Sequence, residues 1–183
     1  MKHLVSLAIF IALALFAWSS ITKYYSDEQQ LQDKTKRYVE VFITEFEMTS
    51  MNDSGKPVYI LNGTSMKRYN DSDENYIQQP VFQLLQTDKR WRVSADSATI
   101  NDKNETIKLT SNVVMQQQDI EPITTIRTQT LTIHTKTQIV KTRAAVTVTQ
   151  GNSELKSNGM VFNNITSQLE LSSNVNGYYL PHD

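Results

Sequence analysis

The hydrophobic pattern divides this chain into an apolar N-terminal segment and a long remainder of alternating polarity. The eighteen residues from Leu4 to Ile21 comprise fifteen apolar residues and three serines, and none of them is charged. As a helix that rises about 1.5 Å per residue, they would extend roughly 27 Å, which is enough to cross a hydrocarbon core. The pattern therefore predicts a transmembrane helix over residues 4–22, with a cytoplasmic tail over residues 1–3 and a polar juxtamembrane linker over residues 23–37.

A cleaved signal peptide is the alternative interpretation of this segment, with Ala17-Trp18-Ser19 as a poor cleavage site. The apolar run is longer than the about 7–15 residues of an ordinary signal core, which favours an uncleaved anchor. Both interpretations send the remainder of the chain across a membrane.

After the linker, apolar and polar residues alternate with the period of a β-strand. Val39, Val41 and Ile43 occupy every second position at its start. Ten threonines lie between residues 120 and 150, and β-branched threonine favours strands over helices. Because no window shows a sustained helical stripe, the sequence predicts a single all-β domain over residues 38–183.

An internal repeat sets the geometry of this domain. The apolar pattern of residues 59–66 recurs at residues 91–98, and the pattern of residues 98–113 recurs at residues 131–146 and again at residues 160–175. One position of the repeat is valine in four successive units: Val81, Val113, Val146 and Val175.

Each repeat unit contains a break in its alternation. The apolar residues change from odd-numbered to even-numbered positions between Ala95 and Ala98, which indicates a bulge or a corner rather than a straight strand. Turn-forming clusters such as residues 52–55 and 101–104 separate the strands. Short strands that turn a corner about every 30 residues predict a stacked β-solenoid or a twisted, open β-jelly roll.

Composition and charge exclude several classes of function. The chain carries 18 Lys and Arg against 19 Asp and Glu, so it lacks the cationic surplus that nucleic-acid binding requires. The absence of cysteine excludes disulfide scaffolds, thiolate zinc sites, iron–sulfur clusters and cysteine nucleophiles. The three histidines lack metal-ligand spacing, and no phosphate-binding glycine loop is present. We therefore expect no metal, no cofactor and no enzyme activity.

Three charged or titratable features have ordinary structural interpretations. Glu40, Glu45 and Glu47 could suggest a glycosidase carboxylate pair, but on an alternating strand they are better explained as a solvated face. The basic cluster at residues 89–92 is either a solvated hairpin edge or a site for anionic head groups. His134 is expected at a strand end or a turn.

Five short motifs follow one another along the β domain: Asp53-Ser54-Gly55-Lys56-Pro57-Val58-Tyr59-Ile60-Leu61, Trp91-Arg92-Val93-Ser94-Ala95, Ile107-Lys108-Leu109-Thr110-Ser111-Asn112-Val113, Thr128-Gln129-Thr130-Leu131-Thr132-Ile133 and Leu169-Glu170-Leu171. In this order, and behind an apolar anchor, they resemble the LptC family of lipopolysaccharide export proteins over the whole chain. The sequence departs from the family pattern at Gly63, where alanine is usual, and at Ser97 and Ser111, where glycine is common.

The resemblance implies a function and a set of partners. Proteins of this family are single-pass proteins of the Gram-negative inner membrane with a periplasmic β-jelly roll. The anchor associates with the lipopolysaccharide ABC transporter, formed by LptB, LptF and LptG. The domain receives lipopolysaccharide and passes it to the periplasmic bridge protein LptA.

The expected site is the interior of the jelly roll. Residues that recur across the repeats should face inward and bind acyl chains there: Trp91, Ile100, Ile107, Leu109, Val113, Leu131, Ile133, Val146, Phe162, Leu169, Leu171 and Val175. The alternative is a membrane-anchored β-repeat scaffold whose interior is simply packed and carries no lipid.

The two end strands should dock partners, because neither is protected by proline within the strand or by dense charge. The expected strands run over residues 38–48 and over residues 169–171 followed by 175–180. The expected docking residues are Tyr38, Val39, Val41, Ile43, Gly159, Val175, Tyr178, Tyr179 and Leu180. The alternative is that the linker and the tail Pro181-His182-Asp183 fold over both edges and cover them.

Overall fold

The computed structural model describes Trp18 and residues 36–85, 90–118 and 121–180. The chain forms two units, residues 1–38 and residues 39–183. The predicted membrane segment and almost all of the linker lie outside the described residues. In the part that is described, no helix has the length and apolar character needed to span a membrane.

The second unit is all-β, as predicted. Its strands are β1 (Val39–Met51), β2 (Pro57–Tyr69), β3 (Glu74–Gln78), β4 (Val81–Leu85), β5 (Arg90–Ser94), β6 (Ser97–Asn101), β7 (Thr106–Gln117), β8 (Thr124–His134), β9 (Ile139–Gln150), β10 (Ser153–Asn163) and β11 (Gln168–Tyr178). His134 is the last residue of β8, at a strand end as expected. β11 is one strand with a register shift, where the sequence predicted two short ones.

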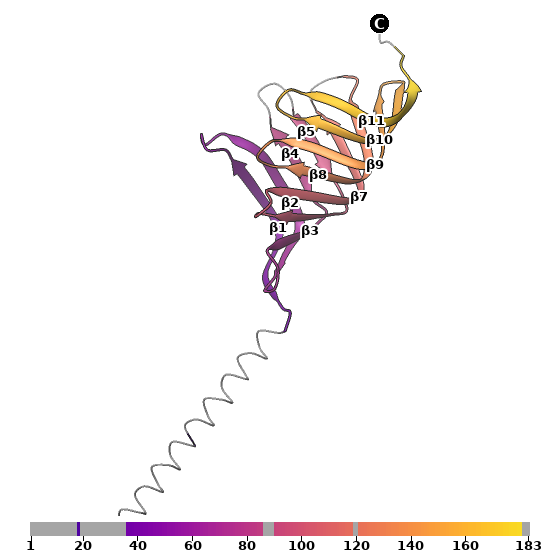
Figure 1. Ribbon diagram of the computed structural model, residues 1–183. Helices are drawn as coiled ribbons and strands as arrows, with labels where there is room; N and C mark the ends of the chain where they lie inside the picture. Colours follow the sequence, from indigo (N-terminus) through magenta and orange to yellow (C-terminus); the bar gives the residue numbers. More distant parts are fainter. Residues whose placement is uncertain (1–17, 19–35, 86–89, 119–120, 181–183) are drawn as a thin grey trace, which may run out of the picture. The chain divides into compact units, whose positions relative to one another are not determined.

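All strands belong to one antiparallel sheet, which runs as a meander from β1 to β11. β3 and β4 pair with successive parts of β2 in one register, so together they act as a single bent strand. β5 and β6 likewise pair with successive parts of β7, with a register shift of one residue between them. The sheet is therefore built from bent strands laid side by side, and β7 to β11 follow one another toward its C-terminal end (Figure 1).

A corner crosses the whole sheet and folds it into two facing halves. Sheet half I contains β3, β6 and residues 39–44, 65–69, 106–110, 130–134, 139–142, 160–163 and 168–171. Sheet half II contains β4, β5 and residues 46–51, 57–63, 113–117, 124–128, 146–150, 153–157 and 174–178. The corner predicted between Ala95 and Ala98 is confirmed, because it separates β5 from β6.

The corner is made by left-handed residues and bulges. Positive φ angles occur there at Glu45, Gln79, Ser111, Asn112, Gly159 and Asn174, and the strand registers shift at the same level. Across it, Asp96 links three strands through its backbone: its N–H donates to the Ser111 carbonyl, and its carbonyl accepts from the Gln79 N–H. The four repeated valines lie shortly after this corner in their strands.

Hydroxyl side chains satisfy backbone groups that the bulges leave without a strand partner. The Thr128 hydroxyl donates to the Ala145 carbonyl at 2.9 Å, and the Ser157 hydroxyl donates to the Gly159 carbonyl at 2.9 Å. Because an unpaired buried carbonyl costs about 1–3 kcal/mol, these bonds allow the corner to be buried. The abundance of threonine and serine thus serves the corner as well as the strands.

The core lies between the two halves and draws equally on both. Half I contributes Ile77, Ala98, Ile100, Ile107, Leu109, Leu131, Ile133, Val140, Met160 and Phe162. Half II contributes Leu61, Phe82, Leu84, Trp91, Val93, Val113, Met115, Ile126, Val146 and Val148. These side chains form one cluster, so the inward faces of the folded sheet meet directly.

Candidate functional site

The structure buries most of the residues expected to face the interior. Nine of them belong to the core: Trp91, Ile100, Ile107, Leu109, Val113, Leu131, Ile133, Val146 and Phe162. Leu169 and Leu171 are half-buried on β11 and pack against that core. Val175 does not fit the expectation, because its side chain is 53% exposed on the end strand, where no described strand covers it.

The two sheet halves are joined at the corner and meet again at the opposite side, which we call the mouth. There the ring of Trp91 in half II packs edge-to-face on the ring of Phe162 in half I, with centroids 5.0 Å apart. Trp91 pairs with Leu84 on the neighbouring strand, and Phe162 pairs with Val140. The contact therefore closes the mouth across the core rather than along a strand.

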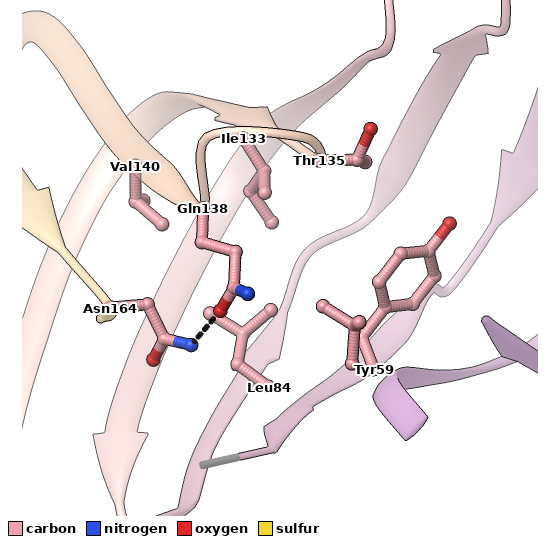
Figure 2. A pocket seen from close by; sticks show the side chains of 8 residues that line it. Tyr59, Leu84, Ile133, Thr135, Gln138, Val140 and Asn164 are labelled. Atoms are coloured by element: carbon pink, nitrogen blue, oxygen red, sulfur yellow. Dashed lines mark hydrogen bonds between the residues drawn. The ribbon is translucent and has the colours of Figure 1, made fainter. Parts of the chain in front are cut away.

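A narrow pocket of about 10 Å³ lies in the mouth beside this ring pair. Figure 2 shows Tyr59 and Leu84 on one wall and Ile133 and Val140 on the other, with Asn164 at one side. The lining is almost entirely apolar. The pocket is smaller than the roughly 300–1,000 Å³ of a typical small-molecule site. The mouth is thus nearly closed in this conformation.

The pocket adjoins a wider hollow of about 320 Å³ toward the β1–β2 turn. The two share Val58, Tyr59, Thr135 and Gln138. The hollow is more polar, and Lys136 forms an ion pair with Glu105 at 3.8 Å at its rim. Hollow, pocket and ring pair therefore follow one another along the mouth, from β2 through β4 to β5.

Buried polar atoms remain unpaired in this region. Trp91 Nε1 and Asn164 Oδ1 have no hydrogen-bond partner among the described residues. Asn164 is held in place by its other groups: its Nδ2 donates to Gln138 Oε1 at 2.9 Å, and its N–H donates to the Gln138 carbonyl (Figure 2). Such atoms cost free energy when they are buried without a partner.

The end strands β1 and β11 each pair with one neighbour, as predicted from their undefended sequences. Exposed apolar side chains gather on them and on the residues next to them: Tyr38, Val39, Phe42, Ile43, Met48 and Met51 at one end, and Val175, Tyr178, Tyr179 and Leu180 at the other. Of the expected docking residues, Val41 is half-buried. Gly159 is not part of an edge at all, because it is buried in β10 between β9 and β11.

The described residues contain no group of three metal-ligating side chains. One pKa is displaced: a 2.8 Å hydrogen bond to Glu154, reinforced by the charge of that carboxylate, raises the pKa of Lys156. Both side chains lie on the solvent side of β10, where such a pair contributes little to stability. The chemical character of the site therefore comes from its apolar mouth and its strand edges.

Comparison with known proteins decides the family. The model of the family described as "Lipopolysaccharide-assembly, LptC-related" matches residues 9–180. The chain belongs to this family. The resemblance found in the sequence is thereby confirmed, and the LptC-related family is one of transport components rather than of enzymes.

A solved structure has the same type of fold. The β domain is similar to LptH, the LptA homologous periplasmic component of the conserved lipopolysaccharide transport device from Pseudomonas aeruginosa, with a TM-score of 0.53 and 11% sequence identity. The alignment covers 67% of this chain and 95% of LptH. At this identity the similarity establishes the fold, an LptA-like jelly roll. No curated protein matches the chain in sequence.

Several residues of the mouth in this LptC-related protein were not among those expected from sequence. Val140 was detectable, since it stands at the repeat position of Ile107. Tyr59 and Leu84 face the pocket from half II, and only the pairing of β2 with β4 brings them together. Asn164 belongs to a turn-forming pair, and nothing in its local sequence indicates that it is buried.

Proposed function

We propose that this chain binds lipopolysaccharide in the interior of its β domain and passes it to a periplasmic LptA-type protein. The proposal rests on membership in the LptC-related family together with one observation: an apolar core between two sheet halves that are joined along one side only. Acyl chains would lie between the halves, and the sugars would remain in water. Each CH₂ group buried there would contribute about 0.8 kcal/mol.

The proposed topology follows the sequence. Residues 1–3 lie in the cytoplasm, residues 4–22 cross the inner membrane of a Gram-negative cell, residues 23–37 form the linker, and residues 38–183 form the periplasmic domain. The anchor would bring the domain to the ABC transporter of LptB, LptF and LptG. Protease accessibility of the domain in spheroplasts would support this topology, and a mature N-terminus near Ser20 would contradict it.

The proposed partner contacts use the ends of the meander. Exposed backbone groups at a sheet edge can pair with a further strand, and the flanking apolar side chains add area. The β11 edge would receive the LptA-type protein and the β1 edge the periplasmic part of the transporter. Both edges carry exposed apolar residues, including Phe42 on β1 and Tyr178 on β11.

The test for cargo uses photo-reactive residues in the full chain, expressed in cells that make lipopolysaccharide. Ile107 faces the core, whereas the adjacent Lys108 is exposed on the other face of β7. We expect lipopolysaccharide adducts at Ile107 and not at Lys108, and Glu170 on β11 provides a second exposed control. Equal labelling of both faces would contradict an interior site.

One observation favours the second candidate, a scaffold without cargo. The interior is filled by the chain's own side chains, and the pocket at the mouth is only about 10 Å³. Mass spectrometry of the purified full chain distinguishes the candidates: co-purified lipopolysaccharide supports the transport function, and a lipid-free chain that still binds an LptA-type protein supports the scaffold.

A further inference from the structure

We propose that the Trp91–Phe162 ring pair is a latch that must part before an acyl chain can pass along the mouth toward β11. The inference rests on the proposed function and specifies where the cargo moves. The group that would pass this latch is the acyl region of lipopolysaccharide, the cargo proposed above.

The position of the ring pair carries the argument. The wide hollow lies between β2 and the β8–β9 turn, the narrow pocket lies between β4 and β9, and the ring pair joins β5 to β10. Beyond Phe162, its cross-strand partner Leu169 already belongs to the C-terminal edge strand. A chain that enters through the hollow and moves toward the C-terminal edge therefore meets the ring pair next.

The strength of the contact suits a barrier that can open. The edge-to-face geometry of an aromatic pair adds little to the stability that its buried area provides. The two rings come from different sheet halves, so separating them breaks no strand pairing.

Leaving buried polar atoms unpaired costs free energy in the closed state, and a ligand that forms hydrogen bonds with them would remove this cost. Trp91 Nε1 is a buried donor without a partner among the described residues, and Asn164, a residue of the pocket wall, has a buried acceptor, Oδ1, without one. An all-hydrocarbon chain would leave both unpaired. An acyl chain that carries a carbonyl and a hydroxyl or amide N–H would satisfy them, so the chemistry favours acyl chains with polar linkages.

The experiment locks the latch chemically, which the chain permits because it contains no cysteine. The full chain carries Trp91→Cys and Phe162→Cys, joined by a short, reducible bis-methanethiosulfonate linker. The matched control carries Lys141→Cys and Val161→Cys, an exposed cross-strand pair within half I, where the linker does not bridge the mouth.

Two photo-reactive positions report cargo on either side of the latch, in detergent with purified lipopolysaccharide. Tyr59 lines the hollow and the pocket, and Leu171 lies on β11 past the ring pair. We expect the lock to leave labelling at Tyr59 intact and to reduce labelling at Leu171 by at least about tenfold, equivalent to about 1.4 kcal/mol. Reduction of the linker restores Leu171 labelling, and the control pair leaves both positions labelled.

Labelling of Leu171 that persists in the locked chain overturns the latch while leaving the transport function standing. An equal loss in the control pair overturns it as well, because the effect is then not specific to the mouth. No labelling at either position in the unlocked chain overturns both the latch and the proposed cargo. If the first pair does not fold, Leu84→Cys with Val140→Cys locks the pocket walls from the same two halves and is read in the same way.

Discussion

Phe46 on β1 lies directly across from Gly63 on β2, and its ring occupies the space that a side chain at Gly63 would need. A Cβ added at Gly63 would lie 2.9 Å from Phe46 Cε1 and 2.8 Å from Ile77 Cγ2. Gly63 has no left-handed φ angle, so the glycine is required by space and not by conformation. The aromatic ring of the end strand therefore fills the space beside Gly63 that a methyl group would otherwise occupy.

We predict that Gly63→Ala destabilises the domain by about 1–3 kcal/mol, the usual cost of overpacking a filled site. Phe46→Leu removes part of the obstacle, so the double variant should be more stable than the sum of the single effects, with a coupling of about 0.5–3 kcal/mol. Urea unfolding of the four chains of this cycle measures the coupling. Additive effects would show that Phe46 and Gly63 do not share this space.

Ser111 and Ser97 lie on either side of the corner, but only Ser111 has a backbone angle that favours glycine. Ser111 has a φ of 65° at the corner, whereas Ser97 begins β6 without a left-handed angle. A left-handed residue costs about 1–2 kcal/mol, and glycine costs about 0.5–1 kcal/mol in chain entropy. We therefore expect Ser111→Gly to stabilise the domain by about 0.5–1 kcal/mol and Ser97→Gly to destabilise it by a similar amount. Thermal unfolding of both variants checks the contrast, and changes of the same sign would contradict it.

Much of this fold could be predicted from sequence because the determining signals are local and repeated. The alternation placed the strands, and the change of parity between Ala95 and Ala98 placed the corner. Burial of nine of the twelve expected interior residues follows from the same periodicity. The prediction that Val175 is buried was wrong, because periodicity indicates which side of a strand a residue lies on but not whether another strand covers that side.

The mouth could not be predicted, because it depends on which strands face each other after the sheet folds. Trp91 packs on Phe162, and Leu84 lies across the pocket from Val140. Each pair joins the two sheet halves, and the twist of the sheet sets how far one half is displaced relative to the other. Nothing in the period-two pattern specifies that offset. Gly159 was misassigned for a related reason: its left-handed φ of 91° serves the corner, and a glycine in a strand can equally mark an edge contact.

We predict that Ser153→Ala releases the residues that follow β11. The Ser153 hydroxyl accepts from the Leu180 N–H at 2.9 Å and donates to the Leu180 carbonyl at 3.1 Å, so one side chain fixes the end of the described chain. Amide hydrogen exchange at Leu180 should accelerate, with protection in β7 and β8 unchanged. Ser173→Ala, which removes a single bond to the Asn158 carbonyl near the corner, is the control and should leave Leu180 protected. Unchanged exchange at Leu180 in Ser153→Ala would show that other contacts hold this end.

The last prediction tests the C-terminal edge through Gly177, which lies opposite Leu155 near the end of β11. A Cβ at Gly177 would lie 2.1 Å from the Glu154 carbonyl oxygen, and the φ angle of 151° is one that other residues rarely adopt. Because backbone cannot yield as a flexible side chain does, Gly177→Ala should detach the end of β11 from β10.

If β11 docks the LptA-type protein by strand addition, capture of that protein by the full chain should fall by about tenfold or more, since a partner strand needs the whole edge. Gly55→Ala is the control for a change at a glycine with positive φ: its φ of 72° in the β1–β2 turn also favours glycine, but its Cβ would meet nothing within 4 Å. Truncation of residues 174–183 should abolish capture and leave association with the transporter intact, because that contact is assigned to β1 and the anchor. Undiminished capture by both Gly177→Ala and the truncated chain would place the docking site elsewhere than the β11 edge.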